Sequence, residues 1–196
     1  MDFLGLTTLT ILEDTLKHIR MNYGVDVDLN KIPLDDEKAF QLFWRGETVG
    51  IFQFESQGMT EYMKQLKPTS IDDLIAMNAL YRPGPMDFIN NYIARKNGRE
   101  PIDCFHPSLE PILKSTYGVI VYQEQVMQVA QTLAGFSLGK ADVVRRIMSK
   151  KKPEELDKIR PEWVDGAMAR GYDKKLADRI FDILIPFSNY AFNKSH

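Results

Sequence analysis

The residues best suited to chemistry lie in one stretch, Gly139–Lys152, in which six of 14 residues are Lys or Arg and one is Asp. As a helix, this stretch would bury one apolar side, made of Val143, Val144 and Ile147. Adjacent Arg145 and Arg146 could both reach one polyanion, because guanidinium groups bind phosphate oxygens in a bidentate fork. Arg146 and Lys150, four residues apart, would repel each other unless an anion bridged them. The stretch therefore predicts a phosphate site, although an ordinary solvated basic face would show the same pattern.

A second polar group, Tyr122-Gln123-Glu124-Gln125, precedes the apolar residues of a predicted helix. Its amide and carboxylate groups, next to an aromatic ring, could orient backbone phosphates or a base. The plainer alternative is the end of a strand followed by the polar first turn of a helix. The residues alone leave both interpretations open.

Other kinds of site find little support. The sequence has no Ser/His/Asp set, phosphate-binding loop or dinucleotide fingerprint, and no Cys/His cluster with metal-ligand spacing. The single cysteine, Cys104, cannot form an internal disulfide, which indicates a reducing compartment and hence the cytoplasm. No apolar run approaches the roughly 20 residues that cross a bilayer, so we expect a soluble protein without a membrane partner.

Charge is distributed unevenly along the 196 residues. The formal net charge is −2, yet residues 136–196 hold 13 Lys and Arg against 9 Asp and Glu, whereas residues 1–60 hold 5 against 10. A surface that is basic all over is therefore excluded, and the cations gather late in the chain. With 44% hydrophobic residues, the chain can bury the core of one large domain or two small ones.

Helices are the main elements that must position these groups. Apolar residues recur every three or four positions between capping and stop residues, which predicts about eight helices. The first is expected over residues 7–22, before Gly24, with four residues facing inward: Leu9, Leu12, Leu16 and Ile19. Short strands are expected over 48–54 and 118–122. The predicted fold class is therefore mainly α, a multi-helix domain with a few short β-strands.

A rigid corner is predicted at Arg82-Pro83-Gly84-Pro85. Ser70 is suited to cap the preceding helix, which must end here because Pro83 disfavours helical geometry at Arg82. Gly84 permits a sharp reversal, and Pro85 suits the first turn of the next helix. The sequence therefore places Arg82 at a fixed bend.

Six long strings resemble the C-family bacterial replicative polymerases, the alpha subunits of DNA polymerase III, in the order and at the spacing of that family. They are Met1–Thr10, Ile51–Met59, Ala79–Met86, Tyr117–Met127, Arg145–Glu155 and Phe192–His196. The resemblance spans essentially the whole chain. It implies that residues 1–10 are the C-terminal edge of a palm domain. Residues 11–196 are then a mostly helical fingers domain, excised and truncated at its C-terminal end.

The resemblance also implies where the chemistry of the family occurs. Three palm carboxylates hold two Mg²⁺ ions, which activate the primer's 3′-hydroxyl and steady the leaving pyrophosphate. Asp2 matches the third carboxylate, as a catalytic residue and metal ligand. The chain lacks the upstream Asp-x-Asp pair and the lysine that usually stands two residues before Asp2. We therefore expect a DNA-directed DNA polymerase (a nucleotidyltransferase) only in the full-length subunit, and an inactive isolated fragment.

The match further assigns binding roles. Arg145 and Arg146 are expected to contact the dNTP triphosphate, and Tyr81 and Arg82 to lie near the nascent base pair. Five residues are expected to approach DNA phosphates: Lys150, Lys151, Lys152, Lys194 and His196. The implied partners are primer-template DNA, dNTP and the palm and thumb of the same subunit. The sliding clamp and clamp loader would bind through regions that this chain lacks.

Two other classes of function compete with that of an enzyme part. A non-catalytic helical module would bind polyanions or a protein partner through the 138–152 face. A pure interaction scaffold would bind no anion. Salt-dependent binding that does not distinguish dNTP from other polyanions would favour the helical module.

Overall fold

The chain folds almost entirely into helices. The computed structural model describes residues 5–149, 153–188 and 191–194. This part contains ten α-helices: α1 (Thr7–Tyr23), α2 (Glu37–Arg45), α3 (Gln57–Leu66), α4 (Ile71–Leu80), α5 (Ile89–Lys96), α6 (Glu110–Leu113), α7 (Gln123–Ala134), α8 (Leu138–Ser149), α9 (Pro153–Ala169) and α10 (Lys174–Ser188). Four short 3-10 helices lie between them: Leu29–Lys31, Pro85–Phe88, Pro107–Leu109 and Lys114–Thr116. The prediction of a mainly α fold is confirmed.

Neither predicted strand forms in the described residues. Segment 48–54 closes into turns, in which the N–H of Ile51 donates to Thr48 O (3.1 Å) and that of Phe54 to Ile51 O (2.9 Å). Segment 118–122 is buried and begins in a turn at Gly118 (φ 76°), and its described residues make a single parallel bridge, between Tyr122 and Phe192. β-rich composition was a misleading signal, because a strand also needs a neighbouring strand.

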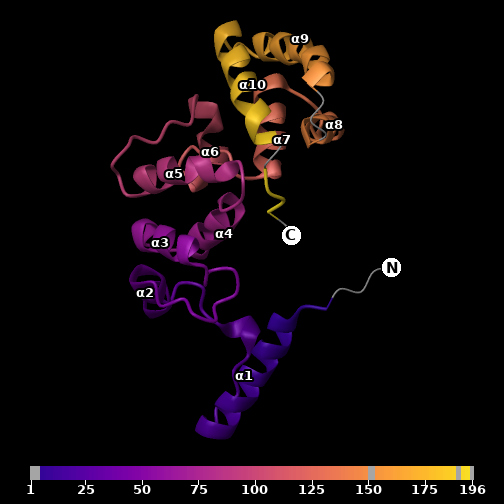
Figure 1. Ribbon diagram of the computed structural model, residues 1–196. Helices are drawn as coiled ribbons and strands as arrows, with labels where there is room; N and C mark the ends of the chain where they lie inside the picture. Colours follow the sequence, from indigo (N-terminus) through magenta and orange to yellow (C-terminus); the bar gives the residue numbers. More distant parts are fainter. Residues whose placement is uncertain (1–4, 150–152, 189–190, 195–196) are drawn as a thin grey trace.

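The helices follow one another in space nearly as they do in sequence (Figure 1). α1 lies at one end of the molecule, α2 to α6 form the middle, and α7 to α10 pack together at the other end. The indole of Trp163 is fully buried in this last group, where its Nε1–H donates to Ala177 O (3.0 Å). After α10 the chain returns to the middle of the molecule.

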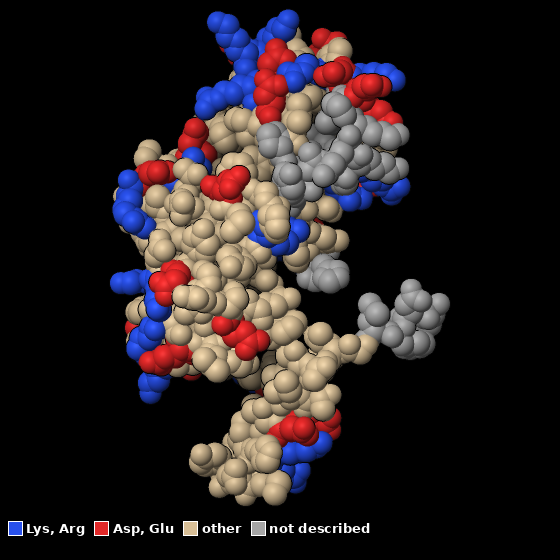
Figure 2. Space-filling view, viewed as in Figure 1, with Lys and Arg blue, Asp and Glu red and all other residues tan. Residues whose placement is uncertain are grey.

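α1 stands out from the body. Its predicted extent and stop are correct, since Gly24 is left-handed (φ 67°) and its N–H donates to Arg20 O (2.9 Å). The predicted inward face is wrong, because no residue of α1 is buried and the side chain of Leu9 is 63% exposed. Figure 2 shows largely uncharged surface over this end of the molecule. Helical periodicity identified the apolar stripe, but the described residues provide no core for it to enter.

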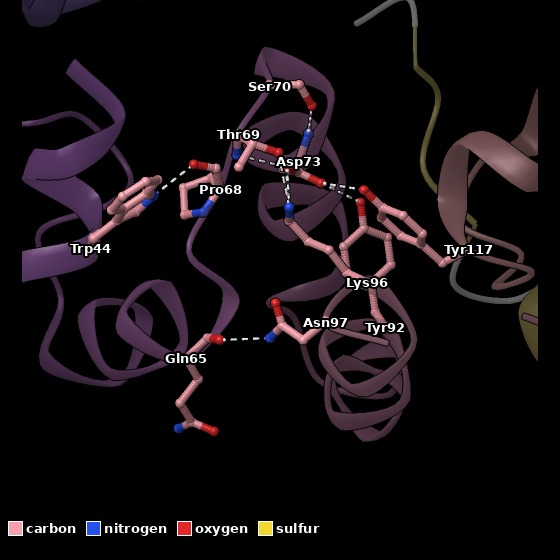
Figure 3. A network of polar contacts seen from close by, with 10 residues as sticks. All are labelled: Trp44, Gln65, Pro68, Thr69, Ser70, Asp73, Tyr92, Lys96, Asn97 and Tyr117. Carbon is pink, nitrogen blue, oxygen red and sulfur yellow. Dashed lines mark hydrogen bonds and ion pairs between the residues drawn. The ribbon is translucent and has the colours of Figure 1, made fainter. Parts of the chain in front are cut away.

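α4 forms between the predicted cap and the predicted corner. Ser70 Oγ accepts the N–H of Asp73 (3.3 Å), and the backbone turns after Leu80, with Gly84 at φ 101°. Asp73 lies in the first turn of α4, and its side chain is only 2% exposed. The carboxylate lies 3.1 Å from Lys96 Nζ and accepts the hydroxyls of Tyr92 and Tyr117 (3.3 Å each) (Figure 3). This network joins α4 to α5 and to the start of segment 117–122.

In the part of the chain that the structure describes, no helix is both long and apolar enough to cross a bilayer.

Candidate functional site

α8 carries two adjacent arginines that share one carboxylate. Arg145 Nε and Nη2 each lie 2.8 Å from Asp142 Oδ1, and Arg146 Nε lies 2.7 Å from Asp142 Oδ2. The hydrogen bond from Arg145 is the main cause that lowers the pKa of Asp142, and the positive charges of both arginines act in the same direction. The carboxylate therefore offsets the like charges of the arginine pair.

The buried side of α8 differs from the predicted one. Ala141 and Val144 are fully buried, whereas Val143 is 50% exposed, so the prediction that Val143 faces the core is wrong. Consecutive helical residues are about 100° apart, and a buried side that includes residues 141 and 144 turns residue 143 outward. The Arg145 side chain consequently emerges at the flank of this packed side (27% exposed), while Arg146 projects farther into solvent (66%).

Arg145 also contacts the start of α7. Its Nη1 donates to Gln123 Oε1 (3.1 Å), and Gln123 is the first residue of that helix. The next polar residue, Glu124, accepts the backbone N–H of Lys194 (3.1 Å). Gln125 is buried and makes only internal contacts. In the polar group at residues 122–125, Gln123 and Glu124 are therefore partly exposed, whereas Gln125 has a structural role.

Residues 191–194, here called the C-terminal strap, run along the start of α7. The N–H of Phe192 donates to Val121 O and the N–H of Gln123 donates to Phe192 O, both at 2.9 Å. Lys194 Nζ lies 3.2 Å from Asp72 Oδ1 and 5.1 Å above the centre of the Tyr122 ring. The strap thus fixes a lysine between α4 and α7.

Arg82 reaches the same region from the corner after α4. Its guanidinium carbon lies 5.0 Å above the centre of the Phe192 ring, and its Nε donates to Ala79 O (2.9 Å). Partial burial lowers the pKa of Arg82. Tyr81 takes another direction, with its ring 5.9 Å from that of Tyr62 on α3. The two neighbours predicted to act together therefore face different surroundings.

These contacts gather four cationic side chains around α7 and α8, and we call them the cation cluster: Arg82, Arg145, Arg146 and Lys194. Groups of this kind bind polyanions, and guanidinium groups bind phosphate oxygens best. Five other predicted site residues lie outside the described residues: Asp2, Lys150, Lys151, Lys152 and His196. Within the described ranges no group of three or more His, Cys, Asp or Glu residues could hold a metal ion, so we derive no step through a metal.

A recess of about 810 Å³ opens elsewhere, between α5, α10 and residues 118–120, with Phe88, Ile120 and Phe187 in its walls. None of the cation cluster lines this recess. Size alone would make it the leading candidate for a binding site. The cation cluster is the better candidate for a phosphate ligand, because two adjacent guanidinium groups converge there on one anion, Asp142.

Comparison with known families decides what kind of domain carries this cluster. A family model described as "Bacterial DNA polymerase III alpha subunit finger domain" matches residues 8–171. This chain belongs to that family. The resemblance seen in the sequence is confirmed, and the matched residues include helices α1 (from residue 8) to α9.

Relatives of this finger domain are similar along the whole chain. It is 53% identical over 196 residues to the DNA polymerase III subunit alpha of Halalkalibacterium halodurans and 51% identical over 195 residues to that of Caulobacter vibrioides. It is 50% identical over 201 residues to that of Thermus aquaticus. Each match covers 100% of this chain but only 18%, 17% and 16% of the respective relative. The chain therefore spans less than a fifth of the length of these relatives.

Two residues that contact the arginines of the cation cluster, Asp142 and Gln123, were not identified from the sequence. Asp142 counted only as one negative charge against six positive ones, and Gln123 only as part of a polar turn. The spacing of Asp142 from Arg145 and Arg146, three and four residues, is a signal that could have identified the shared ion pair. No local signal could have linked Gln123 to Arg145, because they are 22 residues apart and meet only through the packing of α7 on α8.

Proposed function

We propose that this finger domain binds the triphosphate of the incoming dNTP during template-directed DNA synthesis by the full-length subunit, with Arg145 and Arg146 as the phosphate ligands. The observation that carries the proposal is the shared carboxylate. Nitrogens of both guanidinium groups already converge on one small anion, Asp142, from adjacent positions of α8. A phosphate group is the natural ligand for such a pair, because it offers more oxygens and more negative charge than a carboxylate.

Exposure supports the same assignment. An ion pair with access to water is weak, so Asp142 does not prevent the arginines from binding a triphosphate as well. Arg145 is also held to α7 through Gln123, which keeps its guanidinium in place. A charge-assisted hydrogen bond to phosphate stabilises by about 1.5–3 kcal/mol, which is sufficient to control dNTP affinity.

The rest of the cluster suits neighbouring parts of the substrates. We assign Arg82 to the nascent base pair, with Tyr81 as support of the corner from its place against α3. Lys194 is assigned to DNA phosphates together with the residues that the structure does not describe: Lys150, Lys151, Lys152 and His196. Primer-template DNA and dNTP are accordingly the proposed ligands, and the palm and thumb of the subunit the proposed neighbours.

Catalysis itself belongs to the full-length subunit. We assign Asp2 to the palm edge over residues 1–10, as one of the three carboxylates that would hold Mg²⁺, with the fingers from residue 11 onwards. One carboxylate cannot hold two metal ions. The isolated chain is therefore proposed to be inactive and to contribute binding and positioning only.

The test of the proposed function uses the complete subunit with Arg145→Ala or Arg146→Ala. Each variant should weaken dNTP use about ten- to a hundredfold, because one charge-assisted hydrogen bond of ~1.5–3 kcal/mol corresponds to such a factor. Arg→Lys should recover only part of the loss, since an ammonium cannot reproduce the guanidinium fork. Steady-state incorporation across dNTP concentrations gives kcat and KM, and primer-template affinity is measured separately.

Two controls make this test specific. Arg99→Ala removes an exposed arginine that follows α5, away from the cluster, and should leave kcat/KM for dNTP unchanged. Lys151→Ala and Lys152→Ala should mainly weaken DNA affinity, with a reduced salt dependence. Should the arginine variants lose DNA binding while their KM and kcat for dNTP stay intact, the helix contacts duplex or template instead.

A further inference from the structure

Asp142 contacts both Arg145 and Arg146. Each of its two oxygens serves a different arginine, at 2.8 Å for Oδ1 and 2.7 Å for Oδ2. The Asp142 side chain is 27% exposed, so it lies at the edge of the packed face of α8. The two guanidinium groups are therefore held by one residue from the preceding helical turn.

Two adjacent arginine side chains need such support to keep their guanidinium groups together. Each has four rotatable bonds, and the two like charges on adjacent residues push the guanidinium groups apart. A carboxylate three and four residues earlier lies one turn away on the same helix surface, which is the correct distance to hold both. Gln123 supports Arg145 from α7, but the contacts of the described residues give Gln123 no bond to Arg146. Asp142 is thus the shared support.

We infer that Asp142 is a positioning residue for the triphosphate, which orders Arg145 and Arg146 before the nucleotide arrives and stays beside them while they bind it. The inference rests on the proposed function of the two arginines. Because Asp142 acts on the groups that bind the ligand, it improves affinity by reducing the ordering that binding requires. The negative charge of Asp142 repels phosphate, but the ordering of the two arginines outweighs this repulsion and strengthens dNTP binding.

The decisive variant is Asp142→Asn in the complete subunit, which keeps size and shape but removes the charge that holds both arginines. We expect the KM for dNTP to rise about five- to tenfold, a factor close to 1.4 kcal/mol of binding free energy. We expect kcat to stay within about twofold and primer-template affinity to be unchanged, because a positioning role affects the affinity for dNTP alone. Asp142→Glu should recover most of the loss, since it retains the charge one methylene farther out.

A matched control and a mutant cycle separate this role from a general structural one. Asp165→Asn makes the same chemical change at an exposed position of α9 and should leave KM for dNTP unchanged. In an Arg145→Ala/Arg146→Ala background, Asp142→Asn should have no further effect, because its targets are absent. An additional loss in that background would show a general structural effect and overturn the inference.

The remaining outcomes distinguish this inference from the proposed function. Loss of dNTP use in the arginine variants, together with an unchanged or lowered KM in Asp142→Asn, leaves the proposed function standing and rejects the positioning role. Normal dNTP use in the arginine variants rejects both. A lowered KM would further mean that the carboxylate acts as a competitor of the triphosphate and not as its support.

Discussion

At the scale of single residues, Gln125 shows how a polar side chain can stabilise a buried turn. Its Oε1 accepts the N–H groups of Val121 (2.9 Å) and Tyr122 (3.0 Å). Its Nε2 donates to Ile112 O (3.1 Å) and Thr116 Oγ1 (2.7 Å). Every hydrogen-bonding atom of this amide is therefore used, and it satisfies backbone groups that precede α7 and would otherwise be buried without partners.

Replacing Gln125 with Ala should lower the free energy of unfolding by about 2–4 kcal/mol, because two buried N–H groups lose their acceptor. Gln128→Ala, on the exposed side of the same helix, should change it by less than about 0.5 kcal/mol. Urea unfolding followed by circular dichroism measures both values. Similar midpoints for the two variants would contradict the structural role of Gln125.

At the scale of elements, α1 is set apart from the other long helices by its lack of a buried side. Leu9 and Ile11 are 63% and 57% exposed, and the connection to α2 is exposed too, with Leu34 at 65%. The first fully packed residue of the body is Phe40 in α2, at 6%. Apolar surface that stays in contact with water does not stabilise the fold.

Removal of residues 1–34 should therefore change the free energy of unfolding of the body by less than about 1 kcal/mol, since none of the described side chains over 5–34 is buried. Phe40→Ala, which opens a cavity in the core, should cost about 3–5 kcal/mol. Denaturant unfolding monitored by Trp fluorescence compares the two. A truncated chain as unstable as Phe40→Ala would mean that α1 packs on the body in solution.

α1 and α4 also mark how far the sequence could predict the elements. The limits of both helices were predictable, because Gly24, Ser70 and Pro83 act through local backbone geometry. What each helix contacts was not, because burial depends on partners distant in sequence. Arg145 and Arg146 could be proposed as a phosphate site from charge alone, whereas their support by Asp142 and Gln123 required the helix surface and the packing of α7 on α8.

At the scale of the whole molecule, three tyrosines lie near the acidic start of α4. Tyr92 belongs to α5, and Tyr117 and Tyr122 precede α7. Burial is the main cause that raises the pKa of Tyr117 to about 12, and the charge of Asp73 adds to it. Burial likewise raises the pKa of Tyr92 and of Tyr122. All three phenols must stay protonated in the folded molecule.

The free energy of unfolding should accordingly fall as pH rises above about 10, the pKa of tyrosine in an unfolded chain. Above this value the unfolded state releases protons that the folded state retains, so alkaline conditions favour unfolding. Tyr92→Phe should reduce the slope by up to about 1.4 kcal/mol per pH unit, whereas exposed Tyr23→Phe should not alter it. Urea titrations between pH 8 and 11 measure the slopes, and equal slopes in the two variants would refute the prediction.

The long-range contacts of the C-terminal strap predict the order in which parts of the molecule fold. Most helix contacts join neighbours along the chain and can form early, as local contacts do in fast-folding helical proteins. The contact of Lys194 with Asp72 instead closes a loop across 122 residues, and its entropic cost falls only when the intervening helices are already in place. We therefore expect the strap to dock last during folding. Of the cation cluster, Lys194 would then take its position only after α4 and α7 have formed, whereas Arg145 and Arg146 are set within a single helix.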